Sequence, residues 1–200
     1  MPLEDVVLLA SALTDVESAR DYLQLSDDSL DRRVIEWINA ATGWIERRTR
    51  RALKSRSYSG ASALKVNGYG TKEAVCPEYP VTTVSSVSVR ESDGTLTALD
   101  ITGHRIEPGG VIFLPNDVIP EGEANVELTV IAGYLAATHD AELAVLEHAC
   151  ERLVLVYYQD WKDKIGRGTG YSVAGFSVSL IRDPVPADVS DLVDRFGRVP

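Results

Sequence analysis

The spacing of apolar residues changes twice along this chain, and that change limits the folds it can adopt. Between residues 55 and 134, apolar and polar residues alternate in short runs such as TTVSSVSVRE and NVELTVIAGY. Gly, Pro, Asn and Asp separate the runs, as in Asn67-Gly68 and Asp93-Gly94, which is typical of hairpin turns. Connections this short leave no room for the crossovers that parallel strands need. The sequence therefore predicts an antiparallel β module over residues 55–134.

Helical spacing precedes this module. A first helix is predicted over 14–23, where Thr14 and Glu17 have the spacing of a capping box. A second helix is predicted over 28–51, with N-cap residues in LSDDS at its start. One stripe contains its apolar residues: Leu30, Val34, Trp37, Ile38, Ala41, Trp44 and Ile45. This stripe predicts a core-facing side for the second helix, with both tryptophans in the core.

Helical spacing also follows the module. A third helix is predicted over 140–164, and it is apolar on nearly every side at LVLVYY, residues 153–158. Such a helix must be covered on more than one face, so it is either central to the fold or completed by a neighbouring subunit. These elements predict an α+β fold, in which a small helical bundle carries an inserted antiparallel β module.

The C-terminal part has a different composition. Residues 166–175 are Gly-rich, residues 176–181 alternate like one strand, and a short helix follows Pro186. The apolar stripe of this helix consists of Val189, Leu192, Val193 and Phe196. The stripe is too small to fold alone, so it needs a partner surface. We therefore expect two parts, a core over 1–164 and an extended arm over 165–200.

Composition restricts the class of function. The 200 residues carry 30 Asp and Glu against 20 Lys and Arg, for a formal charge of −10. This balance argues against a general DNA-coating protein but allows a local basic patch. No run reaches the length of a membrane span, and Glu4 and Asp5 stand where a signal peptide would be positive. We therefore expect an intracellular protein without a membrane partner.

No catalytic, cofactor-binding or metal-binding site is predicted. His104, His139 and His148 lack a nucleophile or carboxylate at a spacing that indicates a reaction. The stretch GRGTG lacks the Lys-Ser/Thr of a phosphate loop. Cys76 and Cys150 are expected to be buried and reduced, with a disulfide or a metal role as the alternative.

One basic stretch, WIERRTRRALKSRS, stands out in this acidic chain. Its cations include Arg47, Arg48, Arg50, Arg51 and Lys54. They can complement the dipole at the end of the second helix. They can also pair with the acidic surface of a neighbouring subunit, or contact a DNA backbone. The sequence leaves these three interpretations open.

The order of segments resembles a known family. The succession DDSLDRRVIEWINAATGWIERRTRRAL, YPVTTVSSVSV, GGVIFLP and VELTVIAGY, followed by AELAVLEHACERLVLVYY, is similar to that of the head–tail connector proteins of tailed bacteriophages. The resemblance spans roughly residues 14–196, and WIERRTRR and AGY are its most characteristic parts. One departure is LAATHDAEL, which stands where many relatives have a Pro before the third helix.

The resemblance implies a structural role in the virion neck. A ring of identical subunits, usually dodecameric, would lie beneath the portal, extend the DNA channel and provide a platform for a stopper or another neck or tail protein. Genomic DNA would pass without sequence-specific contact, and the subunits would reside in the host cytoplasm during assembly. In the family the C-terminal segment reaches the portal, which would assign portal binding to Val189, Leu192, Val193 and Phe196. Arg47, Arg48, Arg50, Arg51 and Lys54 would lie at a subunit interface or in the DNA channel.

Two alternatives remain at this level. A stopper, head-completion or tail-completion protein of the neck would have similar size and β content. A small intracellular enzyme is a more remote alternative, because the sequence offers no pair of nucleophile and base.

Overall fold

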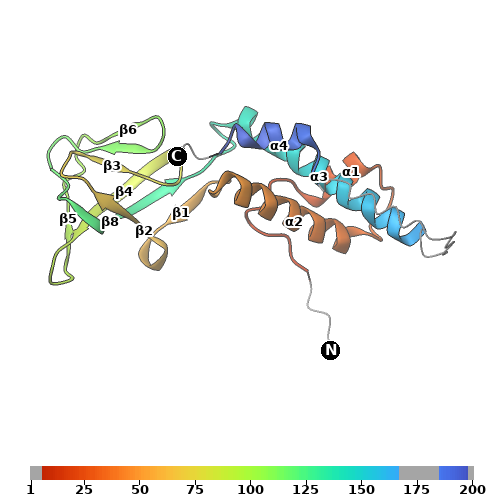
Figure 1. Cartoon of the computed structure of the whole chain (residues 1–200), viewed down its shortest axis with the longest axis horizontal. Coiled ribbons are helices and arrows are strands. Elements are labelled where there is room, and N and C mark those ends of the chain that lie inside the picture. The colour runs from red at the N-terminus through yellow and green to blue at the C-terminus, as the bar shows by residue number, and fades with distance from the viewer. Residues whose placement is uncertain (1–5, 167–184, 198–200) are drawn as a thin grey trace, which may run out of the picture. The chain divides into compact units, whose positions relative to one another are not determined.

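The computed structural model describes residues 6–166 and 185–197, and the chain divides into two compact units (Figure 1). The helical unit comprises Met1–Arg50 and Ala141–Pro200, and the β unit comprises Arg51–Asp140. The predicted α+β class, helical bundle and inserted antiparallel module are confirmed. The grouping differs from the predicted division at 164, because the described C-terminal helix lies within the helical unit.

The described helices of the first unit are α1 (Val16–Leu23), α2 (Asp31–Thr49), α3 (Asp140–Gly166) and α4 (Ala187–Asp194). The Gly-rich stretch after Gly166 and the strand predicted over 176–181 lie outside the described residues. All four helices were predicted, and their bounds differ from the predicted ones by a few residues. Among the described residues, no helix is long and apolar enough to cross a membrane.

The core of the helical unit forms where α2 faces α3. The fully buried side chains of α2 are Val34, Ile38, Ala41 and Ile45, and those of α3 include Leu146, Leu153 and Val154. Trp37 and Trp44 are only half-buried, so the prediction that both belong to the core is wrong. The most buried face is centred on Ile38 and Ile45, which leaves both tryptophans on the flank of α2.

Buried polar groups connect the N-terminal segment to α2 and α3. The hydroxyl of Thr42 accepts a hydrogen bond from the backbone N of Leu13 at 3.2 Å and lies 3.8 Å from Cys150 Sγ. Burial raises the pKa of the Cys150 thiol to about 12. Cys76 and Cys150 are both buried and neither forms a disulfide, as expected, and Cys150 is protonated at neutral pH.

The start of α1 differs from the predicted capping box by one residue. Asp15 is the N-cap, and its carboxylate accepts a hydrogen bond from Ser18 N at 2.8 Å. Thr14 is buried instead, with its hydroxyl 3.4 Å from a carboxylate oxygen of Glu147 and 3.5 Å from one of Glu151. Burial raises the pKa of Glu151, and the neighbouring Glu147 raises it further. The predicted cap is wrong because its hydroxyl finds acceptors on α3, far away in the sequence.

Two antiparallel sheets make up the β unit. The strands are β1 (Arg56–Tyr58), β2 (Leu64–Gly68), β3 (Glu73–Val75), β4 (Val81–Arg90), β5 (Leu96–Ala98), β6 (Arg105–Glu107), β7 (Val111–Phe113) and β8 (Gly122–Ala132), with a short 3-10 helix, η1, at Gly60–Ser62. The larger sheet has the order β1-β8-β4-β5, with β2 also paired to β8, and the smaller sheet has the order β3-β7-β6. The long strand β8 therefore holds three partners together.

One hydrophobic core joins the two sheets. It includes Val87 of β4 and Leu128 of β8 from the larger sheet, and Ile112 of β7 from the smaller one, all fully buried. Burial alternates along β4 and β8, so each strand keeps one apolar and one more polar face. The polar face of the larger sheet therefore stays outside this core.

Gly133, directly after β8, is required by a close approach between two chain segments. Its φ is +109°, and a Cβ atom at this position would lie 2.7 Å from the carbonyl oxygen of Lys54. Tyr134 N donates to Leu53 O at 2.7 Å, and Ser55 N donates to Tyr134 O at 3.0 Å. These bonds attach residues 53–55 to the end of β8.

We expect Gly133→Ala to lower the free energy of unfolding of the β unit by about 2–4 kcal/mol, because left-handed strain and a backbone clash add. Gly94→Ala is the matched control: Gly94 has φ +88°, but nothing lies within 4 Å of a Cβ there. The control should cost only the strain, about 1–2 kcal/mol. Hydrogen exchange of the β4 and β8 amides measures both. Equal losses for the two variants would show that the contact with Lys54 is unimportant.

Candidate functional site

The structure separates the basic residues that the sequence places together. Arg47 and Arg48 lie in the last turn of α2, and Arg50 is its C-cap, with a left-handed φ of 57°. The boundary between the two units follows directly, so Arg51 and Lys54 belong to the β unit. Arg47, Arg48, Arg50 and Lys54 are exposed, whereas Arg51 is buried. The five cations therefore do not form one uniform surface.

Arg51 is a structural residue of the β unit. Its side chain is 4% exposed, and its guanidinium donates to Tyr79 O at 2.7 Å and to Tyr134 Oη at 2.8 Å. The same guanidinium lies over the ring of Tyr79, 3.9 Å from its centroid, and 5.2 Å from that of Tyr134. A planar cation that donates and stacks at once suits arginine and not lysine. As a buried residue it is unavailable to DNA in this conformation.

Arg48 holds the terminal helix against α2. It makes a two-pronged ion pair with Asp194 of α4, with N–O distances of 2.7 and 2.8 Å. This pair lowers the pKa of Asp194, chiefly through the hydrogen bond from Arg48 and also through its charge. A second ion pair joins Arg152 of α3 to Asp188 of α4 at 2.6 Å. Both ends of α4 are thus tied to the helical unit.

The predicted portal-binding stripe lies on this helix. Val189 and Val193 are 2% and 0% exposed, and Leu192 and Phe196 are half-buried. The expected partner surface is supplied by the helical unit in this conformation, and the assignment of the stripe to portal binding stays a prediction. Sequence periodicity identifies an amphipathic helix but does not say which surface covers it.

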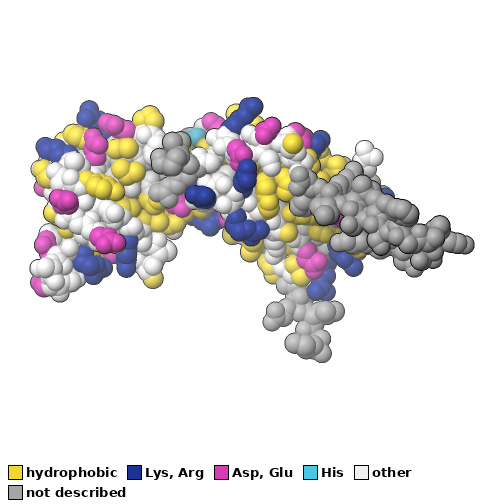
Figure 2. All heavy atoms as spheres, in the orientation of Figure 1, with side chains coloured by type: hydrophobic (Ala, Val, Ile, Leu, Met, Phe, Trp, Pro, Cys, Tyr) yellow, Lys and Arg dark blue, Asp and Glu magenta, His cyan; other side chains and the backbone are white. Residues whose placement is uncertain are grey.

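Arg47 and Arg50 are exposed, so contact with a neighbouring subunit or with a DNA backbone stays possible for both. Tyr157 is a partly exposed neighbour of Arg47. Burial raises the pKa of the Tyr157 phenol, and the positive charge of Arg47 opposes that rise. On the visible face of each unit, Lys and Arg are interspersed with Asp and Glu (Figure 2). That mixed surface is unlike the continuous basic face of a DNA-binding protein.

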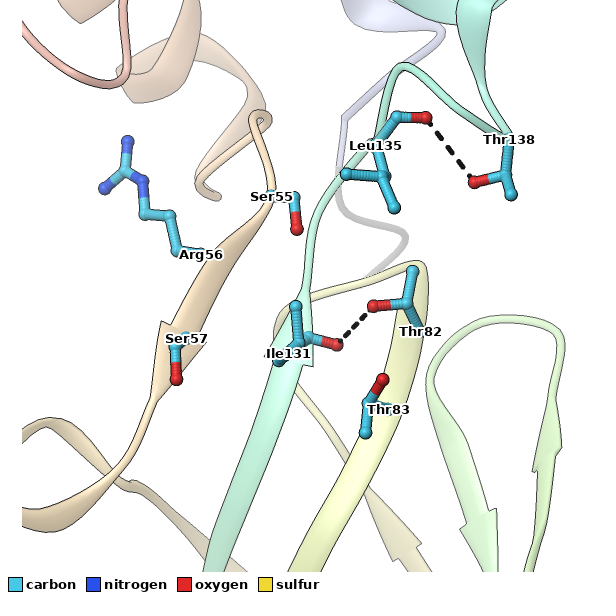
Figure 3. A pocket seen from close by; sticks show the side chains of 8 residues that line it. All are labelled: Ser55, Arg56, Ser57, Thr82, Thr83, Ile131, Leu135 and Thr138. Carbon is cyan, nitrogen blue, oxygen red and sulfur yellow. Dashed lines mark hydrogen bonds between the residues drawn. The ribbon is translucent and has the colours of Figure 1, made fainter.

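The β unit also contains an open groove of about 600 Å³ on the outer side of the larger sheet (Figure 3). Ser57, Ile131 and Thr83 occupy one row across β1, β8 and β4. The other lining residues are Ser55, Arg56, Thr82, Leu135 and Thr138. Arg56 points away from the other labelled side chains (Figure 3). The sequence reasoning missed this groove, because only strand register brings these residues together.

The polar groups of the groove are mostly hydroxyls, and two of them are engaged by the backbone. Thr82 donates to Ile131 O at 3.1 Å and Thr138 to Leu135 O at 3.4 Å, so two of its hydroxyls bind the backbone. Among the eight described residues that line it, none is His, Cys, Asp or Glu, so no general base is present. Within the described part of the chain, no cluster of three or more such residues could hold a metal ion.

Comparison with protein families gives a match to the head completion protein family over residues 12–198. The chain belongs to this family. No curated protein matches its sequence. Among solved structures, it is similar to a chain in the neck of an empty gene transfer agent particle, computed with C6 symmetry, at 23% identity and a TM-score of 0.62.

Two further structures give the same result. A chain in the virion of the native gene transfer agent particle is 24% identical, with a TM-score of 0.62. A chain in the neck of the native particle, computed with C12 symmetry, is 22% identical, with a TM-score of 0.58. Each of the three matches covers 100% of this chain and 97% of the other. At these identities the likeness shows a shared fold over the whole chain.

We expect Arg51→Ala to destabilise the β unit of this head completion protein by about 2–4 kcal/mol, because a buried carbonyl loses its donor and two stacked contacts disappear. Arg47→Ala, at an exposed site, should change stability by less than about 0.5 kcal/mol. Hydrogen exchange of the β-unit amides is the suitable measurement, because Trp37, Trp44 and Trp161 all lie in the helical unit. Equal stability of both variants would contradict a structural role for Arg51.

The docking of α4 should depend on pH. Because Arg48 lowers the folded-state pKa of Asp194, their pair stabilises α4 above the unfolded value of 3.8 and is lost as pH falls through the folded value. NMR signals of the α4 amides should therefore shift on acidification toward those of Asp194→Asn at neutral pH. Asp191→Asn, also exposed on α4, is the matched control and should leave these signals nearly unchanged. Shifts of equal size in both variants would argue against the Arg48 contact.

Proposed function

We propose that this head completion protein is a structural component of the neck of a tailed phage or phage-like particle, where identical copies form a ring on the portal. The observation that carries the proposal is the family match over residues 12–198. The fold shared with chains from gene transfer agent necks supports it, and those necks were computed with C6 and C12 symmetry. The ring would extend the DNA channel and provide a platform for the next neck or tail protein.

Within the neck, we assign the chain to the adaptor position next to the portal. The resemblance to head–tail connectors supports this position, because their C-terminal segment reaches the portal. The name of the family favours a second candidate, a head-completion or stopper protein that would bind after the portal-proximal ring. Both candidates are structural and non-enzymatic, and they differ in whether the chain binds portal directly.

Portal contact through α4 is constrained by the packing of that helix. Val189 and Val193 are buried, so they can contact portal only if α4 leaves the helical unit. Leu192 and Phe196 are half-buried and can contribute apolar area while α4 stays docked. The exposed Arg47 and Arg50 would then act at a subunit interface or the channel wall, where mixed surface charge lets DNA slide without sequence preference.

Native mass spectrometry of the protein with and without its cognate portal tests the proposal. We expect small species alone and, by analogy with the C12 neck, a ring of twelve copies on portal. Leu192→Asp should weaken portal capture by roughly tenfold or more, because a charge enters an apolar contact. Leu96→Asp, at an exposed site on β5, is the control and should bind normally. Direct binding of a pre-formed portal–adaptor complex, but not of portal alone, would favour the stopper position.

A further inference from the structure

The N-terminal segment runs alongside α2 and is fixed there by side chains of that helix. Asn39 accepts a hydrogen bond from Leu9 N at 3.1 Å and donates one to Val7 O at 3.0 Å. One turn further along α2, Thr42 accepts a hydrogen bond from Leu13 N at 3.2 Å. The side-chain amide of Asn39 thus accepts one hydrogen bond from the backbone of the segment and donates one to it, as the backbone of a paired strand does. The backbone of residues 7–13 is held against one flank of α2.

This fixed segment presents two apolar side chains to solvent. Val7 is 72% exposed and Leu9 is 51% exposed. Because their backbone is already held by Asn39, little further ordering would be needed for them to enter a contact. Val7 and Leu9 are therefore candidates for a contact with another chain.

An aromatic cluster lies on the helical unit as well. The rings of Trp37 on α2 and of Tyr158 and Trp161 on α3 have centroids 5.9 to 6.1 Å apart, and all three are half-buried. Two exposed cations flank them: Arg33 lies 5.1 Å from the Trp161 ring and Lys162 lies 5.0 Å from the Tyr158 ring. Trp, Tyr and Arg are the residue types that dominate binding energy at protein interfaces.

These two surfaces lie on different flanks of α2. Trp37 and Asn39 are two residues apart, which corresponds to about 200° around a helix. Arg33 is four residues before Trp37 and shares its flank, whereas Thr42 is three residues after Asn39 and shares the other. In Figure 1 the chain toward the N-terminus leaves α2 on the side opposite to α4. One subunit therefore cannot bring its own Leu9 onto its own aromatic cluster.

Two different surfaces on opposite flanks are what a cyclic ring requires. Each copy in such a ring uses one surface toward one neighbour and the other surface toward the next. Charge is also compatible: Arg33 and Lys162 flank the aromatic cluster, and a neighbouring copy has a net charge of −10. In such a ring the apolar pair of one copy would meet the aromatic cluster of the next copy, and the cations beside that cluster would meet a chain that is acidic overall.

We propose that Val7 and Leu9 of one copy pack onto the Trp37–Tyr158–Trp161 cluster of the adjacent copy, and that this contact closes the ring. The proposal rests on the ring of the proposed function and names the surfaces that form its junction. The occupant of the cluster is a second copy of this chain, not the portal and not DNA.

Cysteine cross-linking tests the junction directly. Leu9→Cys and Lys162→Cys in one chain should give a ladder of covalent multimers under mild oxidation when the protein is assembled on portal. The native Cys76 and Cys150 are buried and should not take part. Each single variant, and the pair Leu96→Cys with Lys162→Cys, should give no ladder. A cross-link within one chain, or a ladder in the control pair only, would overturn the proposal.

A mixing experiment tests whether the junction has two different halves. Val7→Asp with Leu9→Asp removes the donor surface, and Arg33→Glu with Lys162→Glu reverses the charges of the acceptor surface. All four changed residues are exposed, so folding should be retained. Each variant alone should associate at least roughly tenfold more weakly than the unchanged protein. An equimolar mixture should form pairs but no rings, because each pair keeps one intact junction.

The outcomes separate this inference from the proposed function. If the unchanged protein forms rings on portal and both variants also form them, the junction lies elsewhere and the function stands. If the unchanged protein forms no ring on portal, the function and this inference fall together. Pairs in the mixture and not in either variant alone would establish the two surfaces as the halves of one contact.

Discussion

The β unit is organised around a single buried cation. Arg51 bonds the carbonyl of Tyr79, which precedes β4, and the hydroxyl of Tyr134, which follows β8, so it ties together the ends of the two strands with the longest pairing in the sheet. Burial of a guanidinium costs free energy unless its N–H groups have acceptors. Here one carbonyl and one hydroxyl accept hydrogen bonds from it, and two aromatic rings lie beside it. Gly133 allows residues 53–55 to lie against the same end of β8. The two sequence motifs most characteristic of the connector resemblance, the arginine stretch and AGY, therefore meet at one structural junction.

Much of the fold could be predicted from the sequence, because periodicity records which side of an element is buried. The four helices, the antiparallel module and the α+β class follow from apolar spacing and turn residues. Side-chain partners that are distant in the sequence could not be predicted. Arg50 and Arg51 are neighbours of the same type, yet one is an exposed left-handed cap and the other is buried among aromatic rings. Arg51 is buried because Tyr79 and Tyr134 pack around it, and these residues are 28 and 83 positions away in the sequence.

The same limit explains the C-terminal helix and the N-terminal cap. Four apolar residues at helical spacing indicate that a surface must cover α4, but the spacing is equally consistent with portal and with the chain's own α2 and α3. In this conformation α4 packs on the helical unit through the buried Val189 and Val193. The ion pairs of Arg48 and Arg152 with Asp194 and Asp188 add to this contact, and none of these charges has a local sequence signature. Thr14 likewise had the spacing of a cap, and two glutamates on α3 give its hydroxyl another environment.

The net charge of the chain constrains any ring built from it. Copies carrying −10 each repel one another, so close association needs local contacts that offset this repulsion. Apolar contacts offset the repulsion at any salt concentration. Contacts between cations and acidic residues offset it most strongly at low ionic strength. Exposed cations of the helical unit such as Arg33, Arg47, Arg50 and Lys162 would therefore be more valuable at junctions between copies than on a channel wall, where attraction to phosphate would slow the passage of DNA. In a ring of the proposed kind, the acidic surface that remains exposed would face the DNA, and the basic residues would hold the copies together.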